Sequence, residues 1–334
     1  MTRDEITQLS FLIFPGFPMA CLTSMIEPLR AANEIAGKTA FGWKLVSEDG
    51  KRVEASAEVW FEPDMALAEC EDIDHLILLS GPSSKFTQPQ PSEGKLRKLA
   101  RHGAVIGAVS GGVFPLARSG LLEGHAASVH WCYEAAFAAE FPEIEATEDV
   151  IAIGGRRMTA SGAAAAFDLA LHLVEASLGA GVATEVACWF QHPLVRGQGV
   201  IQLKPTVEAE STSDMLPDMV RQAVELFSEN IEDPINIADV ANIVGVSARQ
   251  LERLFFKATG KTPFQYYRFL RMHKARQLLH YSKETLPQIA LAVGCSTPSS
   301  MSRSYTEVFG ISPAEDRKKV NMFRVRDNSI APPA

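Results

Sequence analysis

The sequence has few cysteines and no long apolar run. Its 334 residues include five scattered cysteines without metal-ligand spacing, Cys21, Cys70, Cys132, Cys188 and Cys295. This pattern predicts reduced, buried thiols in place of a disulfide framework, and no metal site. No segment approaches the roughly 20 uninterrupted apolar residues of a membrane span, and the first residues lack the apolar run of a secretory signal. We therefore expect a cytoplasmic protein with no membrane partner, and nothing in the sequence calls for a cofactor.

The net charge of −8 at first argues against a nucleic-acid partner, but the charge is unevenly distributed. Residues 215–334 hold 16 Lys and Arg against 12 Asp and Glu, a net +4, whereas residues 1–214 hold 16 against 28, a net −12. Phosphate contacts need local cations and do not require a positive protein overall. The asymmetry favours a DNA-binding module attached to an acidic domain, although ordinary surface variation is an alternative explanation of +4 alone.

Short apolar runs alternate with amphipathic stretches over the first two hundred residues. The apolar runs predict parallel strands at 9–14, 43–46, 75–79 and 104–109. The amphipathic or apolar stretches predict helices at 24–36, 93–101, 131–141 and 163–178. This alternation predicts an α/β fold with a flavodoxin-like open sheet flanked by helices, whose binding crevice lies at the carboxyl ends of the strands.

A sharp turn is expected after the last of these strands, where Ser110, Gly111 and Gly112 precede a predicted helix. A nucleophile elbow has this arrangement, because small neighbours permit the tight backbone that exposes one side chain above the sheet. His130 is the natural partner of Ser110 if a dyad exists, but nothing in the sequence places a carboxylate against His130. A ligand pocket at Ser110 is the favoured interpretation, and a catalytic serine or a plain structural turn are the alternatives.

Two stretches near the C-terminus, 241–263 and 290–313, are copies of one pattern. Ala241, Val244, Gly245 and Ser247 recur forty-nine residues later as Ala290, Val293, Gly294 and Ser296, and Gly260, Thr262 and Pro263 recur fifty residues later as Gly310, Ser312 and Pro313. Each copy predicts a short helix, a glycine turn and a second amphipathic helix, which is a helix-turn-helix motif. We therefore predict an all-α C-terminal domain with two such motifs, which contacts one face of a duplex twice.

The first motif predicts a recognition helix that begins after Ser247, while Asn236 is expected to cap the helix before it. The buried side of the recognition helix is formed by Leu251, Leu254, Phe255 and Ala258, and its opposite side carries Arg249, Gln250, Arg253 and Lys257. Arginine and glutamine can make bidentate contacts with base edges, whereas Lys257 is better suited to phosphate. A merely solvated basic face is the alternative, because Glu252 lies among these residues.

A long helix from Thr262 to His280 is predicted to connect the motifs rigidly, and its cationic side chains are assigned to no bases because burial or pairing is expected there. In the second motif the helix 299–309 buries Met301, Tyr305 and Val308 and exposes Ser299, Ser302 and Arg303. Only Arg303 is cationic, so this helix should bind more weakly than the first. Two recognition helices on one face must enter successive major grooves, about 34 Å apart.

The segments 14–20, 24–33, 108–122, 127–131 and 168–174 resemble the type-1 glutamine-amidotransferase-like domain found at the N-terminus of a branch of AraC-family transcription regulators. The last hundred residues resemble the AraC/XylS DNA-binding domain, so the resemblance covers nearly the whole chain. The sequence departs from the related enzymes, which carry cysteine where Ser110 stands, and residues 21–24 supply no acidic partner. It also departs from the DNA-binding pattern, which commonly has an aromatic residue at Cys295 and a tyrosine at Asp316.

The resemblance implies a sensing domain with Ser110, Gly111, His130 and Glu27 near the ligand. Regulators with a segment like 24–33 resemble sensors of amino acids and of quaternary ammonium compounds. Aromatic side chains attract such cations, and Phe17, Trp43 and Trp131 are the candidates, although each could equally belong to the core.

We expect four regions: a ligand-sensing domain at 1–195, a polar linker at 196–214, a DNA-binding domain at 215–327 and a disordered tail at 328–334. The predicted protein is not an enzyme. It is a ligand-responsive, sequence-specific transcription regulator, an activator and a homodimer, with double-stranded DNA, a small-molecule effector and RNA polymerase as partners. One alternative is an amidase- or hydratase-like enzyme using Ser110 and His130, with an autoregulatory DNA-binding module. Another is an architectural DNA-binding protein whose first domain only dimerises.

Overall fold

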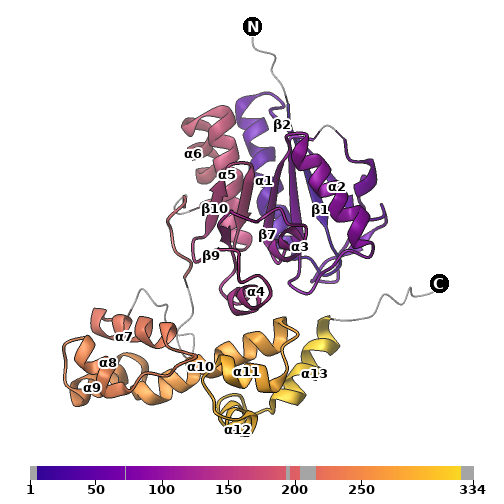
Figure 1. Ribbon diagram of the computed structural model, residues 1–334. Helices are drawn as coiled ribbons and strands as arrows, with labels where there is room; N and C mark the ends of the chain where they lie inside the picture. Colours follow the sequence, from indigo (N-terminus) through magenta and orange to yellow (C-terminus); the bar gives the residue numbers. More distant parts are fainter. Residues whose placement is uncertain (1–5, 72, 193–195, 204–215, 325–334) are drawn as a thin grey trace. The chain divides into compact units, whose positions relative to one another are not determined.

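The computed structural model describes residues 6–71, 73–192, 196–203 and 216–324, with side chains up to residue 318. The chain forms two compact units, residues 1–202 (unit 1) and 203–334 (unit 2). Unit 1 is coloured indigo to magenta and most of unit 2 orange to yellow (Figure 1). None of the described helices is long and apolar enough to cross a bilayer.

Unit 1 is built on a seven-stranded sheet with the strand order β10-β11-β7-β6-β1-β2-β5. The strands are β1 (Thr7–Ile13), β2 (Phe41–Ser47), β5 (Met65–Ala66), β6 (His75–Ser80), β7 (Val105–Ser110), β10 (Ile151–Gly154) and β11 (Arg157–Ala160). All neighbouring pairs are parallel except β10 and β11. The order β2-β1-β6-β7-β11 is that of the flavodoxin-like fold, so the predicted open sheet and its four predicted strands are confirmed.

Helices cover both faces of this sheet. On one face α1 (Met19–Ala36), α5 (Ala163–Leu178) and α6 (Ala180–Trp189) pack together, and on the other lie α2 (Pro89–Arg101) and α3 (Val113–Arg118) (Figure 1). The first face holds an extensive core, where the side chains of Phe11, Ile13, Leu29, Leu169 and Val186 are buried. Phe11 and Ile13 reach the same face because successive side chains of a strand alternate between faces.

Short elements complete unit 1. They are β3 (Val53–Glu54) paired with β4 (Trp60–Phe61), β8 (Ala127–Ser128) paired with β9 (Ala146–Thr147), the 3-10 turn η1 (Leu67–Glu69) and α4 (Glu134–Glu140). α4 begins three residues later than the predicted helix 131–141.

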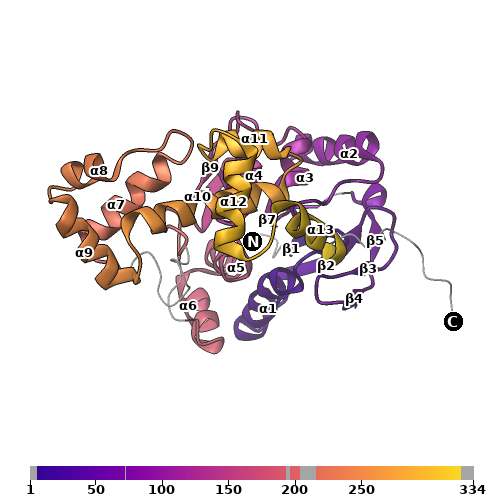
Figure 2. The same cartoon turned by 90° about the horizontal axis from the view of Figure 1, so that it is seen from below.

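The described part of unit 2 is helical throughout. Its helices are α7 (Asp218–Glu229), α8 (Ile237–Ile243), α9 (Ala248–Thr259), α10 (Pro263–Tyr281), α11 (Leu286–Ala292), α12 (Pro298–Phe309) and α13 (Pro313–Arg324). Helices α8 and α9 form the first helix-turn-helix motif and α11 and α12 the second, and α10 runs between the two motifs (Figure 2). The predicted all-α domain with two motifs and a connecting helix is confirmed.

The repeated glycines occupy equivalent turns. Gly245 and Gly294 follow the first helix of each motif with φ of 77° and 64°, and Gly260 and Gly310 end the recognition helices with φ of 67° each. Only glycine adopts this left-handed conformation without steric cost, which explains why it stands at all four positions. Gly294 is constrained a second time, because a Cβ there would lie 2.6 Å from Cγ of Pro234.

Capping pairs begin four of these helices, and all but that of Thr285 are reciprocal, because the Thr285 hydroxyl donates to Oε1 of Gln288. In each, a serine or threonine pairs with a glutamine or glutamate three residues later: Ser247 with Gln250, Thr262 with Gln265, Thr285 with Gln288 and Ser312 with Glu315. These pairs satisfy backbone N–H groups that a helix start leaves without partners. Asn236 stands at the cap position of α8 as predicted, but its side chain makes no capping hydrogen bond.

The residues that follow α6 pack on unit 1. Asp168, fully buried in α5, accepts a hydrogen bond from Nε of Arg196 at 2.9 Å and contacts Nε2 of His192 at 2.9 Å. Gln202 is buried and donates to the carbonyl of Val129 at 2.9 Å. Residues 196–202, at the start of the expected linker, are therefore held against unit 1. Residues 204–214 of that linker and the expected tail, 328–334, lie outside the described residues.

Candidate functional site

The recognition helix of the first motif, α9, presents one apolar and one polar side. Leu251 and Phe255 are fully buried, and Leu254 and Ala258 are half-buried against the same core, as predicted. Arg249, Gln250, Arg253 and Lys257 are all exposed. The helical periodicity thus places the four candidate DNA-contacting residues together on the solvent side.

The three cations on this face are not neutralised within the described part of the chain. No ion pair or side-chain hydrogen bond there engages Arg249, Arg253 or Lys257, although Glu252 lies between them. Unpaired exposed cations suit phosphates and guanine edges, because no internal bond has to break before contact.

Gln250 differs from these cations because it caps its own helix. Its Oε1 accepts from the backbone N of Ser247 at 3.0 Å and from the Ser247 hydroxyl at 3.0 Å. A bidentate contact with adenine needs both the oxygen and the nitrogen of the amide, so that contact would have to break the cap.

The recognition helix of the second motif, α12, repeats this arrangement with less charge. Met301 and Tyr305 are buried as predicted, whereas Val308, predicted buried, is only half-buried. Ser299 and Arg303 are exposed and Ser302 is half-buried. Arg303 is the one cation among the three candidates. Glu307 on the same helix is engaged by Nη1 of Arg268 at 2.7 Å.

The cationic side chains of α10 support the second motif. Arg271 donates from Nε to the carbonyl of Val293 at 2.8 Å and from Nη2 to the carbonyl of Gly294 at 2.6 Å. These carbonyls end α11, where a positive charge also complements the helix dipole. Nη2 of Arg271 also lies 3.5 Å from Sγ of Cys295, one of the two positions that depart from the family pattern. The prediction that the cations of α10 are paired is confirmed for Arg268 and Arg271.

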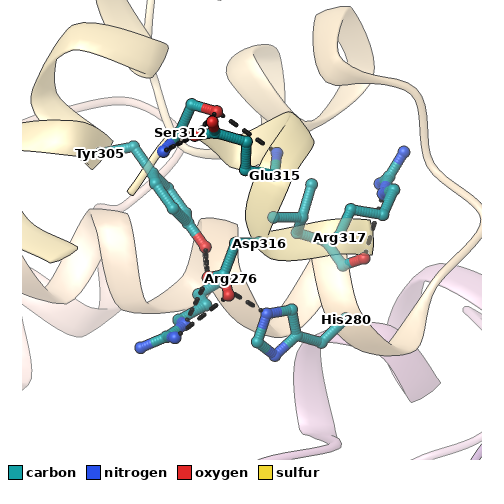
Figure 3. A network of polar contacts seen from close by, with 8 residues as sticks. Arg276, His280, Tyr305, Ser312, Glu315, Asp316 and Arg317 are labelled. Carbon is teal, nitrogen blue, oxygen red and sulfur yellow. Dashed lines mark hydrogen bonds and ion pairs between the residues drawn. The ribbon is translucent and has the colours of Figure 1, made fainter. Parts of the chain in front are cut away.

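Asp316, the second departure, is the centre of a buried polar network (Figure 3). Its Oδ2 accepts from the Tyr305 hydroxyl at 2.6 Å, lies 2.8 Å from Nε of Arg276 and lies 3.3 Å from Nε2 of His280. Burial alone would raise the pKa of Asp316, but the hydrogen bond from Tyr305 and the pairing with Arg276 outweigh it and lower that pKa. Burial, followed by the neighbouring Asp316, raises the pKa of Tyr305. The network ties α13 to both α12 and α10, so it fixes the position of the second recognition helix.

In unit 1 the turn after β7 has the geometry of an elbow. Ser110 has φ of 55°, a left-handed conformation that is strained for a residue with a Cβ, and only 5% of its surface is exposed. A Cβ at Gly111 would lie 2.3 Å from the carbonyl carbon of Gly81, and one at Gly112 would lie 2.1 Å from the carbonyl oxygen of Leu78. The backbone therefore leaves no room for a side chain at Gly111 or Gly112, as expected for such an elbow.

Ser110 and His130 form no dyad in the described structure. The β7–β11 register pairs Val109, the residue before Ser110, with Ala160. Two residues after Ala160, a Cβ at Gly162 would lie 3.2 Å from Cδ2 of His130. Within the described residues no hydrogen bond joins the Ser110 hydroxyl to His130. Nδ1 of His130 instead lies 2.9 Å from Sγ of Cys132, a residue that the sequence analysis did not select for the site.

The remaining candidate ligand residues divide into two groups. The Trp131 ring lies beside His130, with 5.4 Å between the ring centroids, and is half-buried. Glu27 is paired with Nε of Arg30 at 2.9 Å, and Phe17 is fully buried against Phe61. Neither of these two makes a hydrogen bond or ring contact with Ser110 or His130 in the described structure.

Two of the cavities in the described structure lie away from the elbow. One of about 260 Å³ is lined by α10 and by the turn and second helix of the second motif, with Arg271 and Cys295 in its wall. The other, of about 460 Å³, lies at the opposite ends of β6 and β7 beside His75 and Arg156.

Comparisons with known proteins agree with both halves of the structure. Residues 240–319 match the family model of a helix-turn-helix domain, and residues 11–176 match that of the DJ-1/PfpI family. The HTH-type transcriptional regulator GbdR of Pseudomonas aeruginosa is 33% identical over 310 residues, which are 93% of this chain and 84% of GbdR. CdhR of the same organism, also an HTH-type transcriptional regulator, is 33% identical over 310 residues, 92% of this chain and 90% of CdhR.

A solved structure shows the same fold. The crystal structure of an AraC family transcriptional regulator from Pseudomonas putida aligns with 55% of this chain and 99% of its own, at 24% identity and a TM-score of 0.51. With two helix-turn-helix motifs, a DJ-1/PfpI domain and relatives alike over nearly their whole length, the chain belongs to the AraC family of DNA-binding transcription regulators.

Proposed function

We propose that this regulator contacts DNA through the exposed sides of α9 and α12 and that a small molecule bound to unit 1 controls this contact. The single observation that carries the first part is the set of three exposed cations of α9, which no internal ion pair in the described structure neutralises. Arg249 and Arg253 are assigned to base edges and Lys257 to phosphate.

Gln250 is assigned a positioning role with an optional base contact, since its oxygen caps α9. In the second motif Ser299, Ser302 and Arg303 are assigned to DNA. With fewer cations than α9, this helix contributes less to affinity, because both phosphate attraction and guanine contacts depend on positive charge. Two helices on one face predict recognition elements spaced by about one helical turn, or about 34 Å.

The effector site is proposed at the elbow, with Ser110, Gly111, His130 and Trp131 around it. Support comes from the strained turn at Ser110, because strain of this kind persists at sites where a side chain must be held in position. An amino-acid-derived or quaternary ammonium compound fits the resemblance of segment 24–33 to sensors of such molecules, and the Trp131 ring offers a face to a cation. Glu27 is assigned to this site more weakly because Arg30 already pairs with it, and Phe17 is assigned to its buried wall.

We propose sensing, and not catalysis, for unit 1. A catalytic serine needs a base within hydrogen-bond reach, whereas no hydrogen bond joins the Ser110 hydroxyl to either ring nitrogen of His130 in the described structure. The amidase- or hydratase-like alternative predicts that Ser110→Ala abolishes turnover of an amide or hydratable substrate. The sensor proposal predicts that the same variant keeps its DNA affinity and changes only the response to effector.

We further propose that the regulator activates transcription through RNA polymerase as a homodimer assembled by unit 1, in the cytoplasm, where its DNA partner is found. An effector can shift the equilibrium between active and inactive arrangements only by its differential affinity for them. Thermal-shift screening of amino acids and betaines separates this sensor from an architectural protein whose first domain only dimerises.

The decisive experiment is selection of bound sequences from a random DNA pool with the full chain. We expect an enriched site with two elements, and we expect Arg249→Ala with Arg253→Ala to lose about 2–6 kcal/mol of specific binding, since each bidentate contact contributes about 1–3 kcal/mol. Arg221→Ala is the matched control, because this half-buried arginine of α7 is already paired with Asp218 and Glu225. Unchanged sequence preference in the double variant contradicts the assignment of α9.

A further inference from the structure

Two hydrogen-bond donors of Cys132 converge on one nitrogen of His130. Sγ of Cys132 lies 2.9 Å from Nδ1, and the backbone N of Cys132 donates to the same atom at 3.3 Å. A nitrogen that accepts a backbone N–H carries no proton of its own, so the proton of the neutral ring is on Nε2. The geometry therefore directs the lone pair of Nδ1 at the thiol.

The surroundings keep this imidazole neutral at neutral pH. The rings of Trp131 and Tyr133 both contact the His130 ring, each with its centroid 5.4 Å away, and burial lowers the pKa of His130. A neutral ring can accept a proton, whereas a protonated ring cannot. A thiol beside such a base is the usual arrangement of an activated sulfur nucleophile.

The other cysteines lack this arrangement. Cys21 and Cys70 are buried, and burial raises the pKa of both thiols, that of Cys21 to about 12. Cys188 is exposed, and no histidine contacts it in the described structure. Cys295 is half-buried beside the Arg271 guanidinium. The reactivity of Cys132 can therefore be compared with that of the other cysteines in the same chain.

We propose that Cys132 is a covalent modification site for soft carbon electrophiles of the α,β-unsaturated carbonyl class, with His130 as the proton acceptor. The sulfur forms a bond to the β-carbon of the electrophile while the carbon–carbon π bond breaks and its electron pair moves toward the carbonyl. The proton that Nδ1 takes from the thiol is then delivered to the α-carbon, so no group leaves and no oxidant is needed. This chemistry needs no bound effector, although it uses His130, which is also assigned to the proposed effector site.

The test is time-resolved labelling of the full chain with N-ethylmaleimide, with each cysteine-containing peptide quantified by mass spectrometry. We expect the half-buried Cys132 to be labelled faster than the exposed Cys188. In His130→Gln the rate at Cys132 should fall by about 100-fold, the lower end of what general-base catalysis contributes, while Cys188 and Cys295 keep their rates. Cys21 reports on folding, because it is labelled only when the core opens.

Two results overturn the proposal: labelling of Cys132 in the unsubstituted chain that is no faster than that of Cys188, or an unchanged rate at Cys132 in a folded His130→Gln variant. The first comparison decides the matter even if the variant unfolds. Because neither measurement uses DNA or effector, failure here is distinguishable from failure of the proposed function.

Discussion

Asp316→Asn should destabilise unit 2 and disable its second motif. The substitution keeps the shape of the side chain and an oxygen that can accept from Tyr305, but it removes the negative charge facing Arg276. Asp316 is only 3% exposed, and its Oδ2 lies 2.8 Å from Nε of Arg276. Removing one partner of a fully buried ion pair costs about 3–5 kcal/mol. The Arg276 side chain is 37% exposed, so solvent screens part of the loss and we expect about 2 kcal/mol.

The distribution of tryptophan makes this loss measurable in the full chain. All four tryptophans, Trp43, Trp60, Trp131 and Trp189, belong to unit 1, whereas unit 2 is helical. In a urea titration the variant should shift the far-UV circular dichroism transition of unit 2 and leave the tryptophan fluorescence transition unchanged. Asp218→Asn is the matched control, because this carboxylate is 85% exposed in its pair with Arg221 and should change stability by less than about 1 kcal/mol.

The effect of Asp316 should also depend on pH. Its pKa in the folded protein is lowered from the ordinary value of 3.8, so the ion pair stabilises the fold above that value. The stabilisation is lost as the pH falls through the lowered pKa, and the difference between the native chain and Asp316→Asn should therefore disappear in acid. A difference that persists unchanged well below pH 3.8 is inconsistent with a charged Asp316.

On DNA, the same variant should lose protection of the element contacted by α12 and keep that of α9, because the network touches only the second motif. Equal loss at both elements, or an unfolding transition shifted by less than about 0.5 kcal/mol, refutes the assignment of Asp316 as the support of α12.

Three smaller changes test the other features. Ser110→Gly should stabilise unit 1 by about 1 kcal/mol in tryptophan-monitored denaturation, because glycine relieves the strain at φ of 55°, and a loss of stability would mean that the hydroxyl has a structural bond. Gly310→Ala should destabilise unit 2 by about 1 kcal/mol, because alanine is strained at the left-handed φ of 67°. The control Gly94→Ala lies inside α2 with open space around it and should be neutral or stabilising. Equal effects of the two substitutions would contradict the left-handed turn at Gly310. Lys257→Gln should reduce the slope of log affinity against log salt by about 0.9 for every duplex, as binding measurements over a salt series can show, and a sequence-dependent loss would instead indicate a base contact.

Periodicity and repetition predicted most of the fold. The apolar runs located β1, β2, β6 and β7, and the forty-nine- and fifty-residue repeat located both motifs and their glycine turns. Elements without such a signal were not predicted. The strands β3, β4, β8 and β9 have two residues each, too few for an alternating pattern to show. The strands β10 and β11 have four residues each, which is also too short for a clear alternating pattern.

The site was predictable where it depends on one helix and not where it depends on several. The exposed face of α9 follows from the spacing of Leu251 and Phe255 alone. The network around Asp316 joins α10, α12 and α13, and the contact between His130 and Cys132 depends on how one loop folds back on itself. The resemblance marked Asp316 as a departure from the family pattern, but only the folded chain supplies the partners that make a buried carboxylate tolerable.

Helix α10 couples the two motifs through 19 residues, a length of about 28 Å. Both motifs pack against this one helix, so the distance between the two recognition helices is fixed. A base pair inserted between the two halves of an operator shifts one half along the duplex and rotates it about the duplex axis, so both halves can no longer be contacted at once. Base substitutions under α12 should weaken control gradually, whereas insertions and deletions should abolish it in a single step. Operators of this regulator should therefore vary in base sequence and keep a constant spacing between their two halves.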